Sequence, residues 1–404
     1  MMRSPVPARP APRRYRLRRA VVAVLLLLVA PLAAVMALGR PAVGPSAPGP
    51  SSTAAAPPPQ EPQFTEKAFV AEDGARLPLR KWLPNGRVKA VILGLHGFDD
   101  YSHAFDMPAK LWAQHGIATY AYDQRGFGGA PERGGWAGEG RLALDAIEAS
   151  RILRRTYPGR PVYLLGESMG GAVAILAMTG AMRGVIPSGA AMPTADADGV
   201  ILAAPAVWGR ITMKLLPKIA LFTAARLLPS LSLTGGGLHI VASDNKAMLR
   251  ELSLDPMMLR GARVATIYGL VNLMGDALAA ASKLRKPLLL MYGAYDAIIP
   301  PSAVADFAAH LPHAGSPDHR LAYYSRGYHM LLRDLDGPIV AADVTSWILR
   351  RGAPLPSGAD AAERGRPWPP GAAPKPQFPG APEIGAARPM PAPALPLASA
   401  GARG

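Results

Sequence analysis

The sequence predicts an α/β fold in which a mostly parallel central sheet carries helices on both faces and a helical cap insertion. Short apolar runs alternate with amphipathic helical segments from residue 64 to residue 350, and this alternation is typical of parallel βαβ units. Between the strands expected at 199–203 and 287–292 lie more than eighty residues with helical signals only. An insertion after a strand of such a sheet predicts a cap over the site, at about 208–284.

The elements of this body follow in order from their composition. Apolar residues at 69–71 and 77–82 flank Asp73-Gly74, which predicts a hairpin at the start of the sheet. Further strands are expected at the short apolar runs 90–95, 117–122, 161–165, 199–203, 287–292 and 320–324. Helices are expected at 107–115, 142–156, 170–178, 306–310 and 338–350, and in the cap at 211–228, 247–252 and 257–274. Gly116 and Pro158-Gly159 end the first two of these helices.

The segments that flank the body have a different character. Residues 1–39 combine an Arg-rich start with an uncharged apolar run over 20–39, which indicates either an uncleaved signal anchor with a transmembrane helix or a signal peptide cut near Ala37. The body is therefore expected on the extracytoplasmic side of a membrane, or exported to the periplasm or medium. Residues 40–63 form a Pro/Ala-rich linker, and 351–404 are expected to be a disordered Pro/Ala/Gly-rich tail.

Charge and cysteine content exclude several classes of function. The formal net charge is +16, but seven arginines fall before residue 20 with no acid among them, so the body is only mildly basic. A nucleic-acid partner is therefore not expected. The chain has no cysteine, which excludes disulfides, a thiol nucleophile and Cys-ligated zinc.

The sharpest motif is Gly166-Glu167-Ser168-Met169-Gly170, which lies between an expected strand and an expected helix. This context predicts a nucleophile elbow, in which a serine occupies a strained, tight turn. Gly166 and Gly170 are needed because side chains there would clash within the turn. Ser168 is thus the candidate nucleophile, at a helix N-terminus that favours developing negative charge.

The serine needs a base, and the base needs an orienting acid. In proteins with this elbow the acid and then the histidine follow the serine along the chain. Asp296 and His329 satisfy this order, and each follows an expected strand on the same rim of the sheet. Two backbone N–H groups should hold the oxyanion, one from Met169 and one from Phe98 in the turn after 90–95. His96 is expected to brace that turn, and Asp123 and Arg125 to form a pair that fixes the next loop.

Several segments together resemble the α/β-hydrolase superfamily, specifically its monoacylglycerol lipase and lysophospholipase group. The matching segments are HGFDDYS at 96–102, AYDQRGFG at 121–128, GESMGG at 166–171, YGAYDAIIPP at 292–301 and GYHMLLRD at 327–334, with LPSLSL at 228–233 and LSLDPMM at 252–258 in the cap. The resemblance covers about 64–350 and implies the α/β-hydrolase fold. It also implies that Ser168, Asp296 and His329 act as nucleophile, acid and base, with Phe98 and Met169 as oxyanion donors. Members often carry a histidine where this chain has Phe127.

The leading hypothesis is a serine carboxylic-ester hydrolase that acts on monoacylglycerols or lysophospholipids, with a membrane surface as partner and with no metal or cofactor. The first expected cap helix carries apolar residues that would either contact an acyl chain or simply pack against the sheet. They are Leu215, Leu216, Ile219, Leu221 and Phe222. A general esterase or aminopeptidase with the same triad is a second hypothesis, although the acids of the cap are scattered rather than clustered. The third hypothesis is a catalytically silent, membrane-tethered binding module. The oligomeric state does not follow from the sequence.

Overall fold

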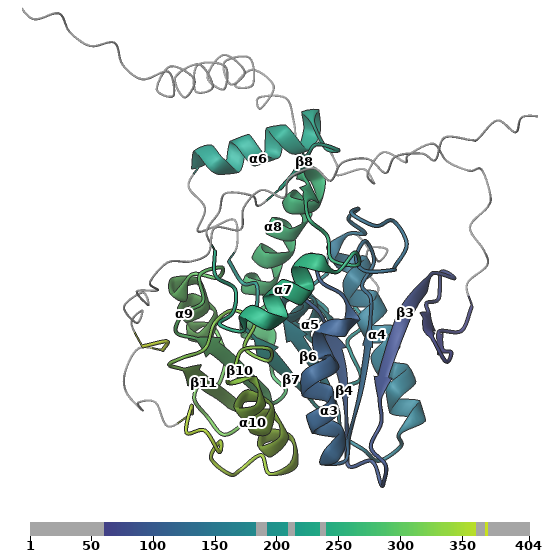
Figure 1. The fold of residues 1–404 in the computed structure, drawn as a ribbon, viewed down its shortest axis with the longest axis vertical. Helices are drawn as coiled ribbons and strands as arrows, with labels where there is room; N and C mark the ends of the chain where they lie inside the picture. The colour runs from purple at the N-terminus through teal and green to yellow at the C-terminus, as the bar shows by residue number, and fades with distance from the viewer. Residues whose placement is uncertain (1–59, 183–191, 209–214, 235–239, 361–367, 371–404) are drawn as a thin grey trace, which may run out of the picture. The chain divides into compact units, whose positions relative to one another are not determined.

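The computed structural model describes residues 60–182, 192–208, 215–234, 240–360 and 368–370 (Figure 1). The leader 1–39 and most of the linker predicted at 40–63 lie outside the described residues, as does the chain beyond residue 370. Among the helices of the described ranges, none is long and apolar enough to span a bilayer. The apolar run at 20–39, where the sequence predicts a signal anchor or signal peptide, is not among these helices because it lies outside the described residues.

Within the described ranges, nine strands form one sheet in the order β1-β2-β3-β5-β4-β6-β7-β10-β11. Neighbours from β5 to β11 run parallel, whereas β1, β2 and β3 form an antiparallel edge. The strands are β1 (Gln63–Phe64), β2 (Ala68–Val70), β3 (Arg76–Trp82), β4 (Ala90–Leu95), β5 (Ile117–Tyr122), β6 (Val162–Glu167), β7 (Gly199–Ala203), β10 (Leu288–Gly293) and β11 (His319–Tyr324). The mostly parallel sheet predicted from the sequence is confirmed.

Helices cover both faces of this sheet, so that alternate residues of each strand enter different cores. On β6, Leu164 belongs to the core that includes residues of helices α4 (Glu139–Thr156), α5 (Met169–Thr179) and α9 (Pro301–Ala309), whereas Leu165 belongs to the core that includes residues of α3 (Asp106–Gln114) and α10 (Gly337–Leu349). Two short 3₁₀ helices, η1 (Ser102–Phe105) and η2 (Ala281–Lys283), join the larger elements. Strands β4, β5, β6, β7 and β10 are buried at every residue, which explains their largely apolar composition.

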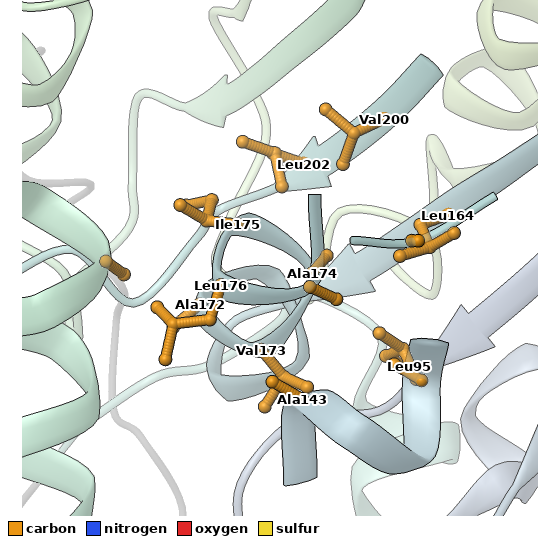
Figure 2. Packing of buried hydrophobic residues seen from close by; sticks show 14 of the residues in the cluster. Leu95, Ala143, Leu164, Ala172, Val173, Ala174, Ile175, Leu176, Val200 and Leu202 are labelled. Carbon is orange, nitrogen blue, oxygen red and sulfur yellow. The ribbon is translucent and has the colours of Figure 1, made fainter. Parts of the chain in front are cut away.

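Helix α5 is the most enclosed helix of the body and carries the predicted elbow at its start. Residues from Met169 to Ala177 are buried, and Figure 2 shows Val173, Ala174 and Ile175 among side chains of neighbouring strands, such as Leu164 and Leu202. The small alanines let the helix lie close to the sheet. Gly180 ends it in the left-handed conformation at φ 66°.

The cap contains more than the helices that the sequence predicts. Its described helices are α6 (Leu215–Leu227), α7 (Lys246–Leu254) and α8 (Val264–Ala279). The helix expected over 257–274 was placed too early, because α8 begins at Val264 and the preceding β9 (Ala262–Arg263) pairs with β8 (Ser232–Leu233). Pro256 and Gly261 account for this difference, since neither residue favours a helix interior.

The folded body extends past both predicted limits, 64 and 350. At its start, Gln63 pairs with Val70 in the sheet, and Gln60 N donates to Glu72 O at 2.9 Å. After α10, Leu355 is buried, Tyr323 N donates to Ala359 O at 3.0 Å, and Arg320 pairs with Asp360. These few anchoring residues are surrounded by Pro and Gly. The average composition of the segment therefore predicts disorder even though single residues within it pack on the body.

We expect residues 64–350 alone to be less stable than residues 60–360. The shorter chain loses the anchors of Leu355 and Asp360 and part of the edge pairing of β1. Its melting temperature should be lower by at least about 4 °C, since burial of one leucine is worth roughly 2 kcal/mol. Leu355→Ala in the longer chain should reproduce part of this loss. Equal melting temperatures, measured by circular dichroism, would show that 351–360 does not stabilise the fold.

Candidate active site

Ser168 lies at a tight turn where β6 passes directly into α5. Its backbone has φ 52° and ψ −115°, a conformation that costs energy in a residue with a side chain. The surroundings hold it there: Ser168 N donates to Ala203 O at 3.0 Å, and Ala206 N donates to Ser168 O at 2.9 Å. A Cβ on Gly166 would overlap the carbonyl of Gly170, and a Cβ on Gly170 would overlap the carbonyl of Leu95. Both glycines of the motif are therefore required by close backbone approach.

Asp296 and His329 form a buried hydrogen-bonded pair at the ends of neighbouring strands. His329 Nδ1 lies 2.9 Å from Asp296 Oδ2, and their side chains are 7% and 0% exposed. The other carboxylate oxygen, Asp296 Oδ1, accepts from the backbone N–H groups of Ile298 and Ile299 at 2.8 and 2.9 Å. The carboxylate is thus fixed in orientation, and it places the proton of a neutral imidazole on Nδ1. Nε2 is left as the basic nitrogen.

The electrostatic surroundings of His329 favour its protonated form. Burial alone would lower the pKa of His329, but the charge and hydrogen bond of Asp296, together with the charge of Glu167, raise it above 6.5. The rise matters because an imidazolium must form when a serine loses its proton. The structure thus provides an imidazole whose charged form is stabilised, which is the property that the base of a serine hydrolase needs.

The predicted oxyanion loop packs directly against the elbow. A Cβ on Gly97 would lie 3.5 Å from Ser168 Cβ, so the loop approaches the serine through a residue without a side chain. Met169, the other expected donor, begins α5 immediately after the serine. Phe98 is half-buried, and its ring packs edge-on against Phe127 at 5.4 Å. Phe127, at the family's histidine position, therefore supports the oxyanion loop.

His96 braces this loop in the way the sequence predicts. Gln124 N donates to His96 Nε2 at 2.9 Å, so the ring proton is on Nδ1, which lies 2.8 Å from Gly97 O. Gln124 Nε2 also donates to His96 O at 2.8 Å. Burial lowers the pKa of His96, which keeps the ring neutral. Its Nε2 thus links this loop to the loop after β5, and its Nδ1 holds the turn at Gly97.

The expected pair between Asp123 and Arg125 is not what the structure shows. Asp123 accepts from Ser102 N and Gly129 N, at 3.0 and 2.8 Å. Arg125 instead pairs with Asp145 on α4 at 2.7 Å and with Asp73 at 2.8 Å. Both residues fix loops, but they do so through different partners, because the turn after Asp123 directs Arg125 toward α4.

The sequence analysis did not assign a role to three charged residues behind the site. Arg333 Nη2 donates to Asp100 Oδ2 at 2.6 Å and to Glu167 Oε1 at 2.8 Å, with all three side chains at most 5% exposed. A signal was available, since each residue lies within four positions of a predicted functional residue. The cluster also ties the loop of His329 to the elbow of Ser168. Among the described residues no hydrogen bond joins Ser168 to His329 directly.

The cap is fastened to the loops that carry these residues. Ala242 O accepts from Met330 N at 3.0 Å, Ser243 Oγ donates to Asp334 at 2.6 Å, and Asn245 Nδ2 donates to Arg333 O at 3.0 Å. A second cap segment meets the oxyanion loop, where Tyr101 donates to Asp255 at 2.6 Å and Leu259 N donates to Asp99 O at 3.0 Å. The cap therefore rests on the oxyanion loop and on the His329 loop.

The fold and this arrangement of loops define an α/β-hydrolase. A family model described as serine aminopeptidase S33 matches residues 86–336, more than half of the chain, and the chain belongs to this hydrolase family. Human monoglyceride lipase is 30% identical over 290 residues, 70% of this chain and 90% of the relative. Monoacylglycerol lipase of Mycolicibacterium smegmatis is 26% identical over 290 residues, 70% of this chain and 97% of the relative.

Solved structures agree with the fold. A soluble variant of monoglyceride lipase from Saccharomyces cerevisiae matches with a TM-score of 0.56 and 22% identity, over 74% of this chain and 99% of its own. The monoacylglycerol lipase of Paleococcus ferrophilus matches with a TM-score of 0.53 and 21% identity, over 68% of this chain and 99% of its own. At such identities the likeness shows the α/β-hydrolase fold.

We expect the imidazole of His329 to titrate with a midpoint above 6.5, and Asp296→Asn to lower that midpoint. The substitution removes the charge that raises the pKa of His329, while the burial that lowers it remains. NMR titration of the ring, assigned with His329→Gln, measures both values. His319, whose pKa is lowered by burial and whose surroundings do not include Asp296, should titrate at the same pH in both proteins. An unchanged midpoint for His329 in Asp296→Asn would contradict this account of its environment.

Proposed function

We propose that the protein is a serine carboxylic-ester hydrolase that acts on monoacylglycerols or lysophospholipids through Ser168, His329 and Asp296. The observation that carries this proposal is the buried Asp296–His329 pair, which leaves His329 Nε2 as the basic nitrogen. The loop of His329 is also tied, through Arg333 and Glu167, to the strained turn of Ser168. The catalytic assignment is the simplest use of these three side chains, because acyl transfer needs a nucleophile, a base and an orienting acid.

The proposed reaction has two halves. Ser168 Oγ attacks the ester carbonyl carbon while its proton passes to His329 Nε2, and the N–H groups of Phe98 and Met169 hold the resulting oxyanion. Collapse of this intermediate breaks the ester C–O bond, and the leaving alcohol takes the proton from His329. Water then attacks the acyl-enzyme, gives its proton to His329 Nε2, and the second collapse returns that proton to Ser168 and releases the fatty acid. No metal or cofactor is required.

The substrate class is supported by the relatives and by the cap. Relatives that match over 70% of this chain are named as monoglyceride or monoacylglycerol lipases. In the cap, Leu216 is 73% exposed and Leu227 is 65% exposed, so this helix is not packed against the sheet. Phe222 lies between, with its ring 6.2 Å from that of Tyr268 on α8. Apolar surface above the site suits a substrate with an acyl chain.

Peptide hydrolysis is the second candidate, because the matching family model is described as a serine aminopeptidase. An aminopeptidase would need carboxylates free to bind the substrate ammonium group. In the cap, Asp244 accepts from Leu335 N at 2.8 Å, and Asp255 accepts from Tyr101 and from Met257 N. These carboxylates hold the cap in place, which favours the ester substrate.

We further propose that the protein works at a membrane surface. The apolar run over 20–39, behind seven arginines, would anchor the chain with its body on the extracytoplasmic side, or export it if cleaved near Ala37. The exposed leucines at the end of α6 would then meet lipid: Leu227 at 65%, Leu228 at 55% and Leu231 at 47%. A lipid substrate would be taken from the same surface.

Fluorophosphonate labelling tests the proposed nucleophile. The wild-type protein should be labelled and should release fatty acid from monoacylglycerol or lysophosphatidylcholine faster than it hydrolyses aminoacyl amides. Ser168→Ala should lose labelling and lower kcat by about four orders of magnitude or more. Ser253→Ala, an exposed serine of α7, is the matched control and should behave as wild type. A folded wild-type protein that is neither labelled nor active would leave the tethered binding module as the better proposal.

Vesicle binding tests the cap surface. With residues 1–39 removed, Leu216→Gln, Leu227→Gln and Leu228→Gln together should weaken binding to phosphatidylcholine–phosphatidylglycerol vesicles at least tenfold, or roughly 1.4 kcal/mol. Hydrolysis of a short water-soluble ester should be unchanged. Ile339→Gln with Leu349→Gln on α10, at 47% and 37% exposure, is the matched control. Equal loss of binding in both variants would show that the cap has no special role.

A further inference from the structure

A fully buried arginine connects three loops of the site. Arg333 is 4% exposed, and its Nη2 bridges Asp100 at 2.6 Å and Glu167 at 2.8 Å. Asp100 follows Phe98 by two positions, Glu167 precedes Ser168, and Arg333 follows His329 by four. Each residue of the bridge therefore belongs to a loop that holds one component of the proposed mechanism.

Such a bridge constrains its loops strongly. A charge taken out of water is tolerated only where partners of opposite charge remain in place, so neither carboxylate can move away from Arg333 without a large penalty. The Arg333 backbone is held as well, because its carbonyl accepts from Asn245 Nδ2 at 3.0 Å and its N–H donates to Met330 O at 2.8 Å. Arg333 is thus held through its Nη2 atom at one end and through its backbone at the other.

We propose that Arg333 is a positioning residue, which fixes the oxyanion loop, the serine elbow and the His329 loop relative to one another. This inference rests on the proposed Ser168–His329–Asp296 mechanism. Placement of this kind matters because a shift of about 1 Å between reacting groups can cost roughly a hundredfold in rate. No contact of Arg333 with substrate is needed for this role.

The cluster also sets the charge that His329 experiences. Asp296, after β10, and Glu167, at the end of β6, raise the pKa of His329, whereas Arg333 on its own loop lowers it. Asp100 lies beyond Arg333 and is bound to it. Asp334 and Asp244, on the His329 loop and the adjoining cap segment, are held by Ser243 and by Leu335 N. Changes at Arg333 and Glu167 should therefore move the titration of His329 in opposite directions.

The decisive measurement is kcat and KM across pH for three variants of the full chain, on a short soluble ester. Arg333→Met should lower kcat about a hundredfold with KM changed less than about threefold, and should move the acid limb of kcat/KM to higher pH. Glu167→Gln, which preserves shape, should move the acid limb to lower pH. Arg333→Lys keeps the charge, so its acid limb should match wild type, and it should recover part of the lost kcat.

A control and a safeguard separate positioning from general stability. Arg320→Met removes another buried, ion-paired arginine, at the start of β11 and away from the strand ends that carry the site. It should lower the melting temperature and leave the acid limb unchanged. If Arg333→Met does not fold, Arg333→Lys and Glu167→Gln decide: a kcat lowered at least about tenfold at the optimal pH, with KM changed less than about threefold, supports the proposal, and kcat values equal to wild type overturn it.

Failure of the inference and failure of the proposed function give different results. Wild-type labelling at Ser168, combined with acid limbs and kcat values of Arg333→Met and Glu167→Gln equal to wild type, would overturn the role of Arg333 alone. A folded wild-type protein that is not labelled would overturn the proposed function and, with it, the inference that rests on it.

Discussion

The strained backbone of Ser168 is the constraint on which the rest of the structure depends. A positive φ in a residue with a side chain persists only where its surroundings leave no alternative. Here the carbonyl of Leu95 leaves room only for glycine at 170. The serine backbone is bound by Ala203 O at the end of the neighbouring strand β7 and by Ala206 N in the loop that follows. The buried helix α5, packed between the sheet and helices α4 and α8, then prevents the turn from relaxing. The packing around the parallel sheet therefore holds Ser168 in a backbone conformation that would otherwise be unfavourable.

Two kinds of contact organise the loops around that residue. Hydrogen bonds to backbone N–H groups, such as those that His96 and Asp123 accept, join the loop after β4 to the loop after β5. The charged bridge from Arg333 to Asp100 and Glu167 joins separate loops, and the cap is fastened to two of them at 242–245 and 255–259. The cap segments are therefore mechanically connected to the residues proposed to do chemistry. A change in how the cap packs should displace these loops before it displaces the strands, because the strands beneath them are buried on both faces.

Much of this fold could be predicted from the sequence, and the exceptions have a common physical cause. Strands such as 199–203 and the elbow at 166–170 are local patterns, so composition and spacing identify them. The cap strands β8 and β9, the packing of Leu355 and the bridge of Arg333 all depend on partners distant in the chain. Arg333 lies 233 positions from Asp100 and 166 from Glu167. The sequence around a charged residue does not show whether its side chain faces water or a buried partner, even when the residue lies next to a predicted catalytic residue.

The site and the cap differ in how closely the structure determines their function. At the carboxyl ends of the strands, buried hydrogen bonds fix Ser168 in its strained turn and Asp296 against His329, so these side chains have little freedom to change position. The described part of α6 presents leucines to solvent and packs on α8 through contacts such as Phe222 with Tyr268. With so few packing constraints, the sequence of such a helix can change without disturbing the elbow. We therefore expect the rigid sheet to set the type of reaction of the proposed hydrolase, and the loosely packed cap to set which ester substrates it accepts.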